Sequence, residues 1–143
     1  MALISVLRAV ADDSALAALD SVARGSSPRV QLAAVETLSA WPSPAALDAL
    51  DRVAKDVKDP TIQSLAVDGA LDHLEAGNNR AADQRLKYYE RLAKVAQTTE
   101  QKARIANGLA AISSPDSEKL RARLLDEIGA DQSVTSRAEP ATN

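Results

Sequence analysis

The chain repeats itself, and the period of this repeat constrains the fold more than any other feature of the sequence. Displacing residues 7–23 by 31 positions aligns nine identical residues within this 17-residue window, among them Asp20 with Asp51. A displacement of 32 aligns residues 28–35 with 60–67, and a displacement of 39 aligns Gly69 with Gly108. Periods of about 20–50 residues are typical of arrays in which each unit packs only on its neighbours. The repeat therefore predicts an open array without a single closed core.

Proline and glycine residues mark where the repeated helices begin and end. A Ser or Asp side chain accepts from free amides of a first helical turn, and a proline after it has no amide to satisfy. Four such pairs open apolar segments with helical spacing: Ser27-Pro28, Ser43-Pro44, Asp59-Pro60 and Ser114-Pro115. Glycines stand where helices should end, at Gly25, Gly77 and Gly129. We predict helices over residues 2–11, 14–24, 28–41, 44–57, 60–76, 79–97, 99–113 and 115–128, and no strand.

Composition favours a helical core and excludes several kinds of site. Of the 143 residues, 45% are hydrophobic but none is phenylalanine, so the core must consist almost entirely of Ala, Leu, Val and Ile. The absence of cysteine and the single histidine exclude thiolate chemistry and most metal and acid–base sites. Residues 130–143 have no periodic apolar set. We predict one all-α domain over residues 1–129 and a flexible tail or linker over 130–143.

The repeated unit resembles that of a known family. The pattern Ser/Asp-Pro-x-Val/Ile-Gln-x-x-Ala-Val, followed by Trp41-Pro-Ser-Pro-Ala-Ala-Leu-Asp-Ala-Leu, is similar to HEAT repeats, particularly those of large bacterial multidomain proteins. The resemblance covers residues 2–129 and implies a right-handed α-solenoid of about four antiparallel helix pairs, which starts here with an unpaired helix. It also implies a scaffold or protein-binding surface without chemistry of its own. Gln31 and Gln63 stand where the family has the Arg or Lys of an inter-repeat ladder.

A polar column along the second helices is the candidate binding surface. The repeat displacements bring to one helical position Ser5, Glu36, Asp68 and Asn107, with Asp72 one turn later. In the family, second helices line the concave side of the solenoid. We expect a protein partner, or an adjoining domain of a larger chain, to bind this column. The alternative is a purely structural spacer in which these are ordinary solvated positions.

Charge argues against nucleic acid as the general partner. The net charge is -3, whereas binding to phosphates needs a basic surface. Some HEAT-like solenoids are DNA glycosylases with a basic concave groove, and the acidic column has the opposite sign. A nucleic-acid alternative rests on four basic residues nearer the C-terminus, Lys102, Arg104, Arg121 and Arg123. No phosphate loop, zinc motif or catalytic triad occurs, so we expect no enzyme activity, metal or cofactor.

The single histidine and the aromatic residues have structural interpretations. His73 lies in the centre of an apolar arc, at the repeat position of Trp41, so we expect both side chains in the core or at its edge. Tyr88 and Tyr89 flank an apolar stripe. One of the two can be buried while the other borders solvent; we expect packing to be their main use, and a tyrosine at the border could also anchor a partner.

Two glycines fall inside predicted helices at equivalent repeat positions. Gly69 and Gly108 each cost about 1 kcal/mol relative to alanine in a helix interior. A close approach between adjacent helices, which a Cβ would obstruct, offsets such a cost. We therefore predict that another helix touches the backbone at both glycines.

The N-terminal segment is the predicted unpaired helix, and its apolar residues are Leu3, Ile4, Leu7 and Val10. An uncovered apolar face at the end of a repeat array favours self-association or docking. The segment lacks the basic leading stretch of a secretory signal, and no apolar run reaches the roughly 20 residues that span a bilayer. We expect a soluble, by default cytoplasmic, chain without a membrane partner.

Overall fold

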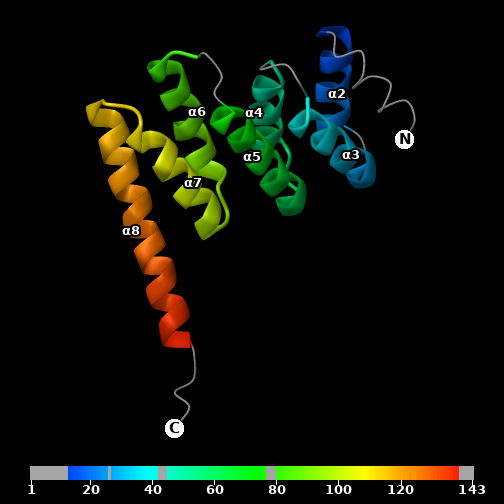
Figure 1. The fold of residues 1–143 in the computed structure, drawn as a ribbon. Coiled ribbons are helices and arrows are strands. Elements are labelled where there is room, and N and C mark those ends of the chain that lie inside the picture. Colours follow the sequence, from blue (N-terminus) through cyan, green and yellow to red (C-terminus); the bar gives the residue numbers. More distant parts are fainter. Residues whose placement is uncertain (1–12, 26, 42–44, 77–79, 139–143) are drawn as a thin grey trace.

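A computed structural model describes residues 13–25, 27–41, 45–76 and 80–138 (Figure 1). The predicted helix at 2–11, and with it Ser5 and the apolar N-terminal face, lies outside these residues, as do Ser43, Pro44 and Gly77. The described part contains seven helices and no strand, which confirms the all-α prediction. The helices are α2 (Asp13–Gly25), α3 (Pro28–Ser39), α4 (Ala46–Asp56), α5 (Pro60–Glu75), α6 (Ala82–Val95), α7 (Thr99–Ala110) and α8 (Pro115–Ala138).

Side-chain caps fix the start of several helices. The Asp59 carboxylate accepts from the amide of Thr61 at 2.9 Å, and the Ser114 hydroxyl accepts from the amide of Ser117 at 3.1 Å. Ser27 occupies the cap position before Pro28, but its side chain makes no capping hydrogen bond. Thr98 and Gln101 form a reciprocal capping box at the start of α7.

The C-terminal helix is longer than the sequence predicts. We expected this helix to end at residue 128, before Gly129, but α8 continues to Ala138, so the predicted end is wrong. Glycine ends a helix by adopting the left-handed conformation, and Gly129 does not adopt it. Without that turn, a single exposed glycine costs the helix only about 1 kcal/mol relative to alanine.

The helices pack on near neighbours alone. Among the described helices, each contacts only those one or two places away in the chain, and none contacts a more distant one. Contacts between alternate helices form two rows, a first-helix row of α2, α4, α6 and α8 and a second-helix row of α3, α5 and α7. The helices accordingly follow one another across the molecule in chain order (Figure 1).

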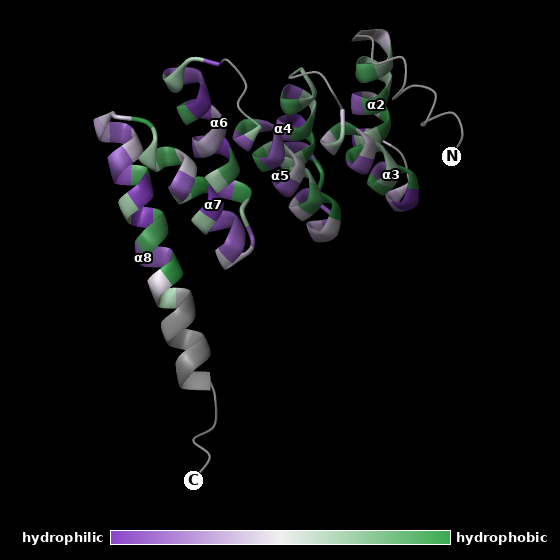
Figure 2. Cartoon of the chain, in the orientation of Figure 1, coloured by the Kyte–Doolittle hydropathy of each residue, from purple (hydrophilic) through white to green (hydrophobic). Residues whose placement is uncertain are grey.

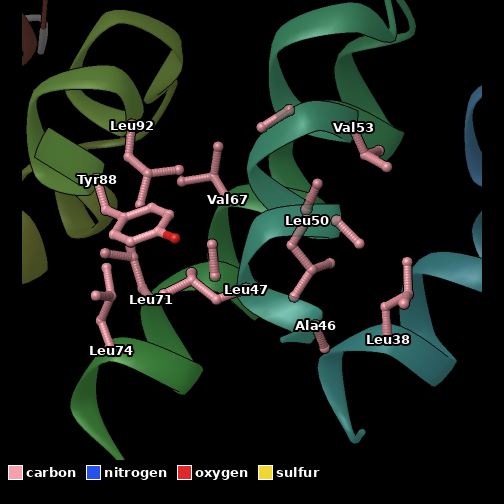
Figure 3. Close-up of a cluster of buried hydrophobic side chains, with 14 of the residues drawn as sticks. Leu38, Ala46, Leu47, Leu50, Val53, Val67, Leu71, Leu74, Tyr88 and Leu92 are labelled. Atoms are coloured by element: carbon pink, nitrogen blue, oxygen red, sulfur yellow. The ribbon is translucent and has the colours of Figure 1, made fainter. Parts of the chain in front are cut away.

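The core is continuous along both rows and is made mainly of aliphatic side chains. Each helix carries both hydrophobic and hydrophilic residues (Figure 2), and its buried apolar side chains pack against those of neighbouring helices. Between α4, α5 and α6, fully buried Leu47, Leu71 and Leu92 pack together with Tyr88 at their edge (Figure 3). Burying a Leu side chain contributes about 1.5–3 kcal/mol, so each helix is stabilised chiefly by its neighbours.

The two glycines inside helices do mark close contacts, as predicted. A Cβ on Gly69 would lie 2.9 Å from the Cβ of Ser39 and 3.3 Å from Cδ1 of Leu50. A Cβ on Gly108 would overlap the phenol of Tyr89. The first contact joins α5 to α3 and α4, and the second joins α7 to α6. Glycine at these positions therefore lets neighbouring helices approach closely.

An ion-pair ladder joins the first-helix row. Asp20 of α2 accepts from Arg52 of α4 at 3.1 Å, and Asp51 of α4 accepts from Arg91 of α6 at 2.6 Å. The two carboxylates are repeat equivalents, separated by 31 residues. Burial raises the pKa of Asp51, while the hydrogen bond from Arg91 opposes this shift. Each carboxylate thus ties one repeat to the next.

Candidate functional site

The predicted polar column lies on the second-helix row. Glu36 belongs to α3, Asp68 and Asp72 to α5, and Asn107 to α7, while Ser5 is outside the described residues. The side chains of Glu36, Asp72 and Asn107 are exposed and that of Asp68 is half-buried. The repeat displacements that define the column therefore place its four described members on α3, α5 and α7, which follow one another in the second-helix row.

An arginine that the prediction assigned elsewhere engages the acidic centre of this column. Arg104 of α7 donates from Nη2 to Asp72 at 2.7 Å and makes a bidentate contact with Glu75, at 2.9 and 2.8 Å. Its Nη1 lies 3.9 Å from Asp68. These contacts, the hydrogen bond to Glu75 foremost, raise the pKa of Arg104 above its ordinary value. Arg104 therefore serves an intramolecular cluster, and its use as a nucleic-acid contact is not supported.

A buried glutamine fixes the other side of the same contact. Gln101, only 1% exposed, donates from Nε2 to the hydroxyl of Ser64 at 2.9 Å and to Asp68 at 3.0 Å. Its Oε1 accepts from the amides of Gln97 at 2.8 Å and Thr98 at 3.3 Å. One side chain thus links α5 to the start of α7.

Hydrogen bonds between amide side chains accompany this link at its outer edge. Gln63 donates to the carbonyl of Ala54 at 2.7 Å, and Gln97 donates to Oε1 of Gln63 at 3.0 Å and to the carbonyl of Pro60 at 3.0 Å. Gln63 occupies the position where the HEAT pattern has a cation. At this position, hydrogen bonds between neutral amides therefore replace the ion pairs of the ladder that the HEAT pattern implies.

The column, predicted to be polar with an acidic middle, is consequently a mixed polar ridge with an acidic bias. Three carboxylates, on Asp68, Asp72 and Glu75, share the Arg104 guanidinium, so the ridge stays net negative. Glu36 has no ion-pair partner among the described residues. The sequence pattern did not indicate the contacts that Gln101 and Arg104 make with α5, because these contacts join residues 37 and 29 positions apart.

The remaining basic candidates do not form an open cationic surface. Lys102 of α7 lies 3.8 Å from Glu127 of α8, and Arg123 approaches the same carboxylate at 3.7 Å. Arg121 is exposed. With Arg104 held by α5, three of the four residues behind the nucleic-acid alternative contact carboxylates of the chain.

His73 and Trp41 are structural, as expected. Nε2 of His73, on a half-buried ring, donates to the carbonyl of Leu38 at 3.0 Å, and Trp41 is 3% exposed. In the described parts of the chain, no group of three or more His, Asp or Glu side chains could hold a metal ion. No helix within them is long and apolar enough to cross a membrane.

Both tyrosines are buried, which agrees with the expected packing role, and Tyr88, 8% exposed, also lines a hollow at the surface. Tyr89 packs against Gly108, and the Tyr88 hydroxyl donates to Asp48 of the neighbouring repeat. Arg80 and Arg91 lie 5.2 and 4.8 Å from the centroid of the Tyr88 ring. Contacts from α4 and from these arginines cover the Tyr88 ring. The apolar periodicity of one helix does not show such contacts, because they come from other parts of the chain.

Burial makes the tyrosines a reporter of folding at high pH. It raises the pKa of Tyr88 and of Tyr89 above 10.0, and these are the only tyrosines of the chain. In the unfolded chain they ionise near pH 10, so their contribution to stability is complete below that pH and is lost as the pH rises through the raised values. We expect phenolate absorbance to appear above pH 10 together with loss of helicity. A Tyr88→Phe/Tyr89→Phe variant should lose helicity at higher pH; ionisation near pH 10 in the folded chain would contradict this.

Comparison of the chain with protein-family models, curated proteins and solved structures gave no match.

Proposed function

We propose that this chain is a HEAT-like α-solenoid module, right-handed and without catalytic activity, that binds a protein partner or an adjoining domain through its second-helix row. The observation that carries the proposal is the two-row packing, in which every described helix contacts only near neighbours. Such packing gives a long surface with side chains in regular rows, which suits an elongated partner.

The ridge has the chemistry of a protein contact. Glu36, Asp72 and Asn107 present exposed acceptors and an amide on three successive helices. The Gln101 and Arg104 contacts hold α5 and α7 together, so these two helices lose little further freedom when a partner binds. Because the ridge is net negative, a partner with Lys or Arg side chains and amide donors complements it. A spacer that binds nothing is the alternative.

The test uses substitutions that leave the contacts of Arg104 with α5 intact. Changing Asp68 or Asp72 would place a new charge beside Arg104, so we choose Glu36→Lys with Asn107→Lys. Ser39 is half-buried and lies beside Gly69, so the exposed residues Ala40 and Ala110 carry the photo-reactive cross-linker. In the cells that produce this chain, we expect the cross-linker at these two positions to capture one partner protein. The Glu36→Lys/Asn107→Lys variant should no longer capture it.

The matched control is Glu118→Lys with Gln84→Lys, two exposed residues outside the ridge that make the same change of net charge. This control should retain the cross-linked partner, and circular dichroism should show equal helicity in both variants. If positions on the first-helix row gave cross-links in the same yield as the ridge positions, or if the ridge positions gave none, the result would favour the spacer that binds nothing.

A further inference from the structure

Lysines without ion-pair partners cross the first-helix row, away from the ridge. Lys55 of α4 and Lys94 of α6 line a hollow of about 270 Å³ between these helices. Lys94 also lines a hollow of about 390 Å³ together with Lys119 of α8. All three side chains are exposed, and none has an ion-pair partner among the described residues. They form a lysine row, one residue from each of three successive first helices.

The second of these hollows lies where the ion-pair ladder stops. Asp51 pairs with Arg91, and the equivalent residues one repeat later are Glu90, 39 positions on, and Arg123, 32 positions on. Glu90 and Arg123 both line the hollow between α6 and α8, but Arg123 contacts Glu127 at 3.7 Å instead. The last step of the ladder is therefore not formed. Lys94 and Lys119 line the same hollow without ion-pair partners among the described residues, so they are available to a carboxylate from outside.

We propose that the two hollows bind an extended acidic peptide, with a carboxylate at every third residue, that runs across α4, α6 and α8. Packed helices lie about 8–10 Å apart, which sets the spacing expected between neighbouring members of the lysine row. A polyproline II segment rises about 3.1 Å per residue and has three residues per turn. Every third side chain thus lies on one face at about 9 Å intervals, which matches one carboxylate to each lysine.

The lining of the hollows favours a peptide over nucleic acid. Asp51 lies in one hollow, and Glu90 and Asp116 lie in the other. A phosphate at every nucleotide would be repelled by these carboxylates, whereas a peptide can place neutral residues and backbone amides beside them. Val95 and Leu120 add apolar surface for the residues between the acidic positions.

The experiment measures fluorescence anisotropy of a labelled peptide of four Glu-Pro-Ala triplets at low ionic strength. Lys55→Glu/Lys94→Glu/Lys119→Glu should raise its Kd by about tenfold or more, because each step loses a charge pair and gains a repulsion. The matched control, Arg29→Glu/Lys58→Glu/Arg121→Glu, makes the same change of net charge at exposed positions outside both hollows and should change the Kd by less than about twofold.

Two further probes test the spacing and the chemistry. A peptide of equal composition with contiguous glutamates should bind about threefold or more weakly, since fewer of its carboxylates reach separate lysines. A short DNA duplex should bind more weakly than the triplet peptide. The Glu36→Lys/Asn107→Lys variant should bind the triplet peptide undiminished, so this result is independent of the ridge.

Three outcomes would overturn the inference. Equal losses in the lysine-row variant and the control would show only general attraction to a charged chain. A duplex bound more tightly than the peptide, and lost in the lysine-row variant, would assign the hollows to phosphates. Salt-dependent self-association that the same variant abolishes would make a second copy of the chain the occupant. Circular dichroism of each variant establishes that the helices are retained.

Discussion

Replacing Gln101 with leucine will lower the free energy of unfolding by about 2–4 kcal/mol, although the two side chains have similar volumes. The amide of Gln101 is buried and joins α5 to α7 through Ser64 and Asp68, and it accepts from two backbone amides at the start of α7. Leucine leaves those amides and the Asp68 carboxylate without this partner while α7 stays in place. Urea unfolding monitored by circular dichroism measures the loss.

Gln97→Leu is the matched control for this effect. Gln97 is exposed and donates to Gln63 and to the Pro60 carbonyl, groups that water can reach when the side chain is removed. We expect this change to cost about 0.5–1 kcal/mol. If Gln101→Leu were no more destabilising than Gln97→Leu, the buried amide would not be what holds α7 to α5.

Gly108→Ala will destabilise the chain by about 1–3 kcal/mol, in spite of the higher helix propensity of alanine. The added Cβ would overlap the ring of Tyr89, which is 2% exposed and enclosed by its neighbours. Since the ring is rigid, the contact can be relieved only if α6 and α7 move apart. Thermal unfolding of the single variant measures the effect.

Gly129→Ala provides the control, because nothing lies within 4 Å of the position of its Cβ. In the extended helix α8 this change should raise stability by as much as about 1 kcal/mol. In a Tyr89→Leu background the cost of Gly108→Ala should fall, since a smaller and more flexible side chain can yield. An undiminished cost in that background would place the strain somewhere other than the α6–α7 contact.

The helices themselves could be predicted because their signals are local. Apolar periodicity and the pairs at Asp59 and Ser114 identified the first residues of the described helices to within a few positions. The cost of Gly69 and Gly108 inside helices was enough to predict close approaches. Gly129 shows the limit of such reasoning, because a glycine ends a helix only if the chain turns left-handed there.

The character of the candidate site could be predicted only in part. Helical wheels brought Glu36, Asp68, Asp72 and Asn107 to one row, since that placement follows from the repeat period. They gave no account of Arg104, which lies in a later helix and neutralises part of the column. The sequence did contain one signal for the ion-pair ladder, because Asp20 and Asp51 are identical residues at equivalent positions of the repeat.

The sequence by itself determined the helical class, the repeat and the faces that must be buried, because these depend on periodicities within 10 to 40 neighbouring positions. Only the tertiary structure decided which charges neutralise one another and which stay available. Ion pairs and hydrogen bonds between helices require atoms to lie within about 3–4 Å, and that distance depends on how the helices pack. The same packing encloses both tyrosines, holds Arg104 against α5 and leaves the lysine row open.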